Sequence, residues 1–285
     1  MKLIKSALVL EGGALRSLYG AGVLDVFLEN DIKFEYVVGV SAGALNAGNY
    51  ISGQIGRSAR VNIDYVDDPR YIGIKHLIKE GSIFNFDFLF GEPTKEWMPY
   101  DEKAFINSKQ RYVIGATNCL TGREEFFERN NYSELTEVLK ASSSMPLLSE
   151  FTYINRVPYL DGGIANAIPY DKAIKDGYEK IVIVLTRPEG YFSKERKSLD
   201  VFMNVYYHKY PNLVRKLCTM SNRYNYLLKK IKCLEKKGKV FVIRPTSLLN
   251  VKRVEKDKNK LKLLYLEGKE DARNRLKEMN KYLEI

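Results

Sequence analysis

At residues 36–47 the chain reads Tyr36-Val37-Val38-Gly39-Val40-Ser41-Ala42-Gly43-Ala44-Leu45-Asn46-Ala47. An apolar run typical of a buried strand comes first, and small residues that can continue as a helix follow it. Ser41 stands at the change, where a sharp strand-to-helix turn exposes the hydroxyl and the flanking glycines avoid steric collisions. The positive end of the following helix favours negative charge at the same point. This stretch therefore predicts an α/β fold with Ser41 as a candidate nucleophile.

A glycine-rich turn follows the first predicted strand, at Glu11-Gly12-Gly13-Ala14-Leu15-Arg16. Consecutive glycines can present several backbone N–H groups to one point, and no side chain blocks the approach. Such a loop can hold the oxyanion of an acyl-transfer reaction. An ordinary strand-to-helix turn has the same composition, so both interpretations stay open at this stage. The dinucleotide spacing Gly-x-Gly-x-x-Gly is not satisfied here, and the phosphate-loop motif is absent.

A serine nucleophile needs a proton acceptor, and the best candidate is Asp161 in Pro158-Tyr159-Leu160-Asp161-Gly162-Gly163. Asp161 ends a predicted strand and begins a tight turn, from which its carboxylate can reach a neighbouring strand end. A carboxylate alone can act as the base where burial raises its pKa. A plain Asp-Gly turn is the alternative interpretation.

The chain has only two histidines, His76 and His208. The order Ser41, Asp161, His208 matches the serine–acid–histidine order of α/β-hydrolases. That fold is disfavoured, because a nucleophile about forty residues from the start leaves too few preceding strands. His208 also falls in a helical pattern rather than on a short loop after a strand. We therefore expect a serine–aspartate dyad without histidine.

Short apolar or β-branched runs alternate with helical patterns along the chain, which predicts a mostly parallel central sheet between two helical layers. The predicted strands are residues 7–10, 36–40, 112–117, 157–160, 181–185 and 240–243. Residues 53–100 read as an insertion of short helices and loops over the sheet. The tail at residues 256–284 reads as helical with an interruption at Gly268. No apolar run reaches the roughly 18 residues that a membrane-spanning helix needs.

Basic residues are concentrated in one segment of this 285-residue chain, whose net charge is +11. Residues 194–239 hold thirteen Lys or Arg and three acids, a local net charge of +10. Apolar residues recur there at helical spacing, so the segment is either a helical hairpin packed on the core or a cap that lies on anionic lipid. Nucleic acid is not expected as a partner. The candidate membrane contacts are Lys229, Lys230, Lys232, Lys236 and Lys237.

Taken together, three motifs resemble the patatin-like phospholipases, which are serine–aspartate dyad acyl hydrolases. They are the glycine-rich turn at residues 12–16, the elbow at residues 39–43 and Asp161-Gly162-Gly163. Weaker likenesses lie at residues 116–122, 141–146 and 166–169, and the resemblance covers roughly residues 6–187. The chain departs from the family where Ala14 replaces a third glycine and where Ser17 replaces a frequent glycine.

The resemblance implies a mechanism in which Ser41 attacks an ester and Asp161 takes its proton. It also implies that N–H groups of Gly12, Gly13 and Ala14 form the oxyanion hole. Arg16 would orient this loop or contact an anionic head group, or else is a surface arginine. The implied fold is the family's three-layer α/β/α sheet, the implied substrate is a lipid or another acyl ester, and no metal or organic cofactor is implied.

The expected organisation is a catalytic core at residues 1–190, a basic helical cap at 191–238, and a final strand with C-terminal helices at 239–285. Cys119, Cys218 and Cys233 are odd in number and widely spaced, so we expect a reducing cytoplasm, with the protein also able to sit on the inner membrane surface. A soluble carboxylesterase or thioesterase with the same dyad, and an inactive binding module, remain alternatives. The oligomeric state is not indicated.

Overall fold

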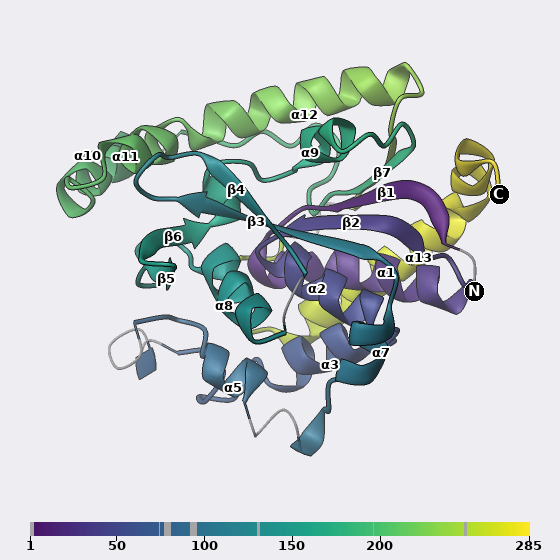
Figure 1. Ribbon diagram of the computed structural model, residues 1–285, viewed down its shortest axis with the longest axis horizontal. Coiled ribbons are helices and arrows are strands. Elements are labelled where there is room, and N and C mark those ends of the chain that lie inside the picture. The colour runs from purple at the N-terminus through teal and green to yellow at the C-terminus, as the bar shows by residue number, and fades with distance from the viewer. Residues whose placement is uncertain are drawn as a thin grey trace.

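The computed structural model describes residues 3–73, 75–76, 81–91, 96–129, 132–195, 197–247 and 250–285. Within them the chain forms one eight-stranded sheet with helices on both faces (Figure 1). The strands are β1 (Ile4–Leu10), β2 (Phe34–Val40), β3 (Arg111–Asn118), β4 (Glu124–Glu128), β5 (Thr152–Ile154), β6 (Val157–Asp161), β7 (Ile181–Val184) and β8 (Phe241–Ile243).

The five strands β3, β2, β1, β7 and β8 pair in that order and are all parallel. Strands β4 and β6 both run antiparallel to β3, and β5 forms a hairpin with β6. The predicted mostly parallel α/β sheet is therefore confirmed. The short strands β4 and β5 were not predicted. β4 carries charged residues that break the apolar pattern of a buried strand.

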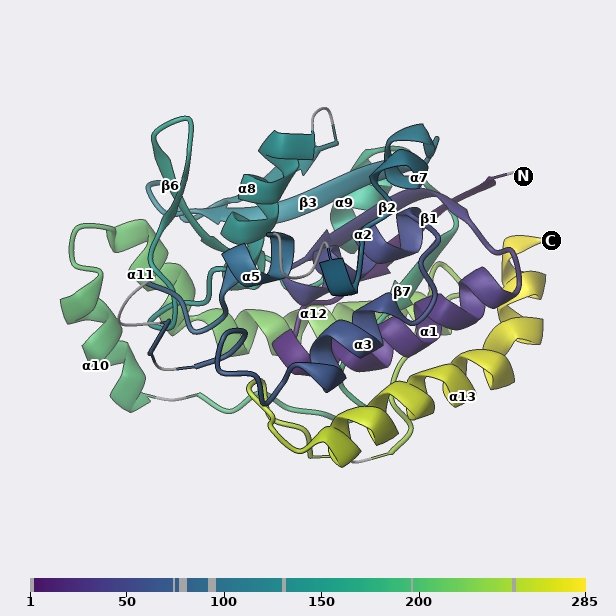
Figure 2. The ribbon, with the colours of Figure 1, turned by 90° about the horizontal axis from the view of Figure 1, so that it is seen from below.

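The two faces of the sheet carry separate helical layers, which confirms the three-layer architecture. Leu8 and Leu10 pack with α1 (Leu18–Glu29), α2 (Ala42–Ile51) and α13 (Lys258–Leu283). Ala7 and Val9 point to the other face and pack with α9 (Tyr170–Lys175) and α12 (Met220–Lys236). Figures 1 and 2 show α12 and α9 across the sheet from α1 and α13. Strict alternation along β1 thus gives each face its own core.

The expected interruption of the C-terminal helix at Gly268 is wrong, because α13 runs without a break through it. Gly268 faces α1, where a β-carbon added to the glycine would lie only 2.1 Å from the carbonyl oxygen of Tyr19. Tyr19 also donates a hydrogen bond from its hydroxyl to Asp271 at 3.0 Å. The glycine therefore serves close helix–helix packing, which outweighs its low helix propensity.

The described part of the insertion at residues 53–100 contains the short helices α3 (Arg57–Asp64) and α5 (Phe86–Phe90), as predicted. The remaining helices are η1 (Ala14–Ser17), α7 (Glu102–Asn107), α8 (Tyr132–Ser143), η2 (Gly162–Ile164), α10 (Lys197–Tyr206) and α11 (Pro211–Cys218). Residues 74, 77–80 and 92–95 of the insertion lie outside the described residues. No helix of the described ranges is long and apolar enough to cross a bilayer.

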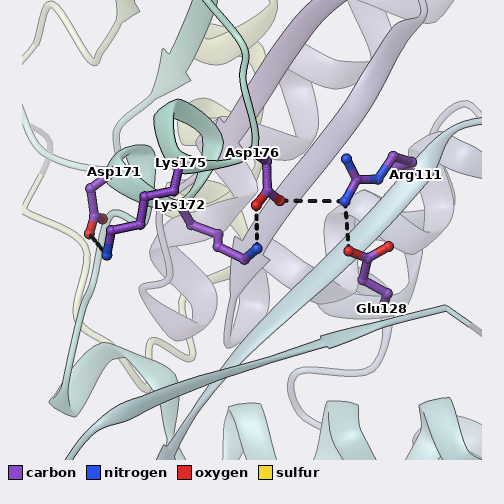
Figure 3. A network of polar contacts seen from close by, with 6 residues as sticks. All are labelled: Arg111, Glu128, Asp171, Lys172, Lys175 and Asp176. Atoms are coloured by element: carbon purple, nitrogen blue, oxygen red, sulfur yellow. Dashed lines mark hydrogen bonds and ion pairs between the residues drawn. The ribbon is translucent and has the colours of Figure 1, made fainter.

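Ion pairs connect the C-terminal end of α9 to β3 and β4 (Figure 3). Arg111, the first residue of β3, contacts Glu128 at 2.6 Å and Asp176 at 3.5 Å. Asp176 also pairs with Lys172, one turn earlier. Because parallel strands start at one edge of the sheet and end at the other, Arg111 lies at the amino edge, opposite the carboxyl edge where β2 ends.

Candidate active site

The pairing along β3 brings the end of β2 against the end of β6. β4 pairs along one side of strand β3 at residues 113–117, so β2 and β6 both pair along its other side. On that side Val40 pairs with Gly115, and Asp161 pairs with the next residue, Ala116. The carboxyl ends of β2 and β6 therefore meet beside β3. Since Ser41 directly follows Val40, it and Asp161 become neighbours despite their separation in sequence.

Ser41 forms the predicted strand-to-helix elbow with a strained backbone. Its φ is +54° and its ψ is −135°, a conformation that residues other than glycine rarely adopt. The turn is tight because it packs on the end of β1, where a β-carbon on Gly43 would lie 2.7 Å from the carbonyl oxygens of Leu10 and Glu11. Ser41 lines two cavities at the start of α2.

Ser142, near the end of α8, holds the elbow in place. Its hydroxyl accepts the N–H of Ser41 at 2.8 Å and donates to the carbonyl of Gly115 at 2.7 Å. Ser144 likewise uses its carbonyl to accept the N–H of Asp161 at 2.8 Å. Sequence reasoning gave this serine-rich stretch only as a weak likeness, because its role depends on α8 crossing both strand ends.

The carboxyl group of Asp161 is buried beside Ser41. Its Oδ1 accepts a hydrogen bond from the N–H of Gly163 at 2.7 Å, and the Ser41 hydroxyl lies near enough to lower its pKa. Burial raises the pKa of Asp161, while the Ser41 hydroxyl, the N–H of Gly163 and the positive charge of Arg253 oppose the rise. The net direction is upward, which makes the carboxylate a stronger base than an exposed aspartate.

The glycine-rich turn lies directly beside Ser41. A β-carbon on Gly12 would lie 2.9 Å from the β-carbon of Ser41. The N–H groups of Glu11 and Leu15 are bonded to carbonyls of Val184 and Arg253. No acceptor among the described residues takes the N–H groups between them, those of Gly12, Gly13 and Ala14. These three residues line the smaller of the two cavities together with Ser41.

Ala14 occupies a conformation that explains the glycine expected there. Its φ of +51° lies in the left-handed region, which glycine adopts without steric cost. The alanine keeps its N–H group at that position and adds one methyl group to the mouth of the site. Alanine in place of glycine at position 14 thus changes the lining of the site but keeps the backbone N–H group.

The side chain of Glu11 ties the glycine-rich turn to β7 and α12. Its carboxyl group accepts the N–H of Thr186 beyond β7 and the hydroxyl of Tyr224 on α12, the latter at 2.6 Å. Burial raises the pKa of Glu11, and the hydrogen bonds from Tyr224 and Thr186 work against that rise. The basic segment is thereby linked to the loop beside Ser41.

Neither histidine lies beside Ser41 and Asp161. The His208 ring contacts the carbonyl of Val205 at 3.0 Å near the end of α10, and the His76 ring contacts the carbonyl of Pro69. Neither residue lines the cavities at Ser41. Within the described ranges, no group of three or more His, Cys, Asp or Glu side chains could hold a metal ion.

Two cavities meet at Ser41. The larger, of about 350 Å³, is lined mostly by apolar side chains, with polar ones such as Asn46, Arg57 and Asn62 from α2 and α3. The smaller, of about 120 Å³, contains Asp161, the glycine-rich turn and several polar side chains. Ser41, Ala14 and Met145 line both. A ligand with an apolar part and a polar part can therefore bind next to Ser41 with one part in each cavity.

Arg16 and the five predicted lysines lie in different places. Arg16 lines the smaller cavity, and its Nε is buried without a hydrogen-bond partner among the residues that the structure describes. The lysines are exposed on and just beyond α12, which packs on the sheet through Ile231. They are Lys229, Lys230, Lys232, Lys236 and Lys237. Lys232 pairs with Glu189, which follows β7, at 2.7 Å. None of the five lysines lines the cavities at Ser41.

A serine on a strained elbow at the carboxyl edge of a mostly parallel sheet defines an α/β protein with a nucleophile elbow. The model of the patatin-like phospholipase family matches residues 8–174. The chain belongs to this family. A second model, a domain of unknown function (DUF6363), matches residues 210–284. The predicted boundary between residues 238 and 239 falls inside this second match and stays a prediction.

Two curated relatives match part of the chain. The uncharacterized protein YjjU of Escherichia coli (strain K12) is 29% identical over 192 residues, covering 64% of this chain and 52% of YjjU. The probable lipid hydrolase 463L of Invertebrate iridescent virus 6 is 25% identical over 182 residues, covering 59% and 63%. The matches thus span about half to two thirds of these relatives.

Among solved structures, VipD from Legionella pneumophila aligns with a TM-score of 0.47 and 11% sequence identity. The alignment covers 97% of this chain and 67% of VipD.

Proposed function

We propose that the protein is a serine acyl hydrolase that acts on lipid esters through Ser41 and Asp161. The observation that carries the proposal is that Ser41 and the buried Asp161 carboxyl lie side by side in one cavity, with no histidine in its lining. Membership of the patatin-like phospholipase family supports the reaction class. The name of the viral relative, a probable lipid hydrolase, supports the choice of lipid esters.

In this mechanism Ser41 attacks the ester carbonyl while Asp161 accepts the hydroxyl proton. The N–H groups of Gly12, Gly13 and Ala14 stabilise the oxyanion, and the α2 N-terminus adds its positive dipole. Asp161 then gives the proton to the leaving alcohol as the acyl–serine ester forms. Water, losing a proton to Asp161, attacks that ester. The acid leaves, and the proton returns to Ser41.

The larger cavity is the proposed site for the acyl chain. Its lining includes Leu45, Val61, Phe86 and Leu89, which remove a hydrocarbon chain from water. Burial stabilises such a chain by about 0.8 kcal/mol per methylene group. A soluble carboxylesterase or thioesterase with the same dyad is the second candidate, and the polar cavity next to Ser41 is consistent with either leaving group.

Contact with an anionic membrane through the α12 lysines stays a separate proposal. Vesicle sedimentation tests it with anionic liposomes and with a variant carrying Glu at all five positions. Binding that the five substitutions abolish supports the membrane role. An absence of binding at low salt, where surface attraction is strongest, supports the soluble alternative.

Labelling with a fluorophosphonate probe, which reacts with activated serines, tests the proposed enzyme. We expect rapid labelling of the natural protein and none for Ser41→Ala. Ser108→Ala, at the amino edge of the sheet, is the matched control and should label normally. A folded natural protein that stays unlabelled would support an inactive binding module instead.

A further inference from the structure

Three arginines reach the smaller cavity beside Ser41 from three separate loops. Arg16 follows β1, Arg187 follows β7 and Arg253 follows β8. These strands are parallel neighbours in the sheet, so their carboxyl ends bring the three loops to one edge. The convergence of three cations follows from the topology, although the residues are far apart in sequence.

None of the three guanidinium groups has an ion-pair partner in the part of the chain that the structure describes. The Nε of Arg16 is buried without a hydrogen-bond acceptor among the described residues. Arg187 lies over the ring of Tyr191, with its guanidinium carbon 4.3 Å from the ring centre. Arg253 is near enough to Asp161 to stabilise its charge. The carboxyl groups of Glu11 and Asp161 line the same cavity, and burial raises the pKa of both. Three arginines against two such carboxyl groups leave an excess of positive charge, which attracts an anionic ligand.

The position of this cluster relative to Ser41 indicates which part of a substrate meets it. An ester held at Ser41 with its acyl chain in the larger cavity directs its alcohol part into the smaller one. The smaller cavity, at about 120 Å³, has room for a compact group, since one water takes up roughly 30 Å³ in the liquid. Phosphate is compact, and its oxygens match the fork of donors on arginine.

We propose that Arg187 and Arg253, together with Arg16, bind a phosphate monoester on the alcohol part of the substrate. The preferred substrates are then acyl esters of glycerol phosphate, in contrast to neutral acylglycerols or esters with a bulky choline head group. This inference rests on the proposed hydrolase function. It assigns to Arg187 and Arg253 the choice of leaving group.

The test compares three water-soluble octanoyl esters, those of glycerol 3-phosphate, glycerol and glycerophosphocholine, at concentrations where each is monomeric. Monomers remove any recruitment to a charged surface, so kcat/KM reports recognition at the site. We expect the phosphate monoester to be preferred over the neutral ester by about tenfold or more, as charge-assisted hydrogen bonds provide. Arg187→Gln and Arg253→Gln should each reduce that ratio by about tenfold.

The ratio of two substrates cancels effects on Asp161, because both esters use the same base. Arg60→Gln, an exposed arginine on α3, is the matched control and should keep the natural ratio. Equal kcat/KM for the three esters, or a preference for the choline ester, would overturn the head-group site and leave the hydrolase intact.

A binding measurement separates the two proposals if none of the esters is hydrolysed, an outcome that removes the hydrolase. Calorimetry with Ser41→Ala then compares octanoyl glycerol phosphate with octanoyl glycerol. Tighter binding of the phosphate compound, lost with Arg187→Gln, supports the anion site by itself. Equal affinities would overturn it.

Discussion

The amino edge of the parallel sheet and the site at Ser41 differ in how their charged groups are paired. At the amino edge Arg111 pairs with Glu128 and Asp176, so its charge is compensated by neighbours. At the carboxyl edge Asp161 is buried with a raised pKa, and Arg253 has no ion-pair partner among the described residues. Buried charged groups with shifted pKa values cluster at functional sites, whereas ion pairs between neighbouring side chains stabilise the fold. The comparison predicts which substitutions change activity and which do not.

The largest effect is expected at Asp161. Asp161→Asn should lower kcat/KM for p-nitrophenyl butyrate by about three orders of magnitude, because general base catalysis contributes 10²–10⁴-fold. In the natural protein, kcat/KM should fall as pH drops through the pKa of Asp161. Since burial raises that pKa, the acid limb should lie above the range of an ordinary aspartate. A limb at or below the ordinary range would contradict the buried base.

The same substitution should stabilise the fold at neutral pH. With a raised pKa, the folded state binds more protons than the unfolded state, so the free energy of unfolding falls as pH rises toward that pKa. The asparagine side chain carries no charge and removes this loss. Urea unfolding at several pH values measures it, and the advantage of Asp161→Asn should grow with pH and then level off. A constant difference at all pH values would argue against the raised pKa.

The glycine-rich turn should rank next. Gly12→Ala places a β-carbon 2.9 Å from the β-carbon of Ser41, so the loop has to move and its donors lose alignment. The expected loss in kcat is about 10²-fold, the lower range for one oxyanion donor. Gly190→Ala, at a site with open space and positive φ, controls for the cost of replacing a loop glycine. Similar kinetics for the two variants would remove the turn from the mechanism.

A smaller effect is expected in the apolar cavity. Val61→Phe narrows it, so octanoyl esters should lose activity relative to acetyl esters. Each excluded methylene is worth about 0.8 kcal/mol, or roughly fourfold in kcat/KM. A series of p-nitrophenyl esters of increasing length measures the effect. If all lengths fall equally, the acyl chain lies elsewhere.

The smallest effect is expected at the amino edge. Arg111→Gln breaks two partly exposed ion pairs, which together should cost no more than about 1 kcal/mol of unfolding free energy. The kinetics should be unchanged, because Arg111 lies at the opposite edge from Ser41. A kinetic defect in a stably folded Arg111→Gln protein would break the contrast between the edges.

Local pattern predicted more of the fold than of the cavity walls. The strand at residues 36–40 and the elbow at Ser41 were predictable, because alternation and glycine spacing act over a few residues. The prediction of a helix break at Gly268 was wrong, because this glycine is needed for close packing against Tyr19, which is distant in sequence. Arg187 and Arg253 were missed because their convergence depends on the strand order. Their positions soon after predicted strands were the one available signal.

The decisive measurement is the hydrolysis rate of a protein without histidine. The double variant His76→Ala and His208→Ala should hydrolyse p-nitrophenyl butyrate at close to the natural rate, while Asp161→Asn should retain about a thousandth of it. A folded double variant that has lost activity, next to an active Asp161→Asn protein, would contradict the serine–aspartate dyad.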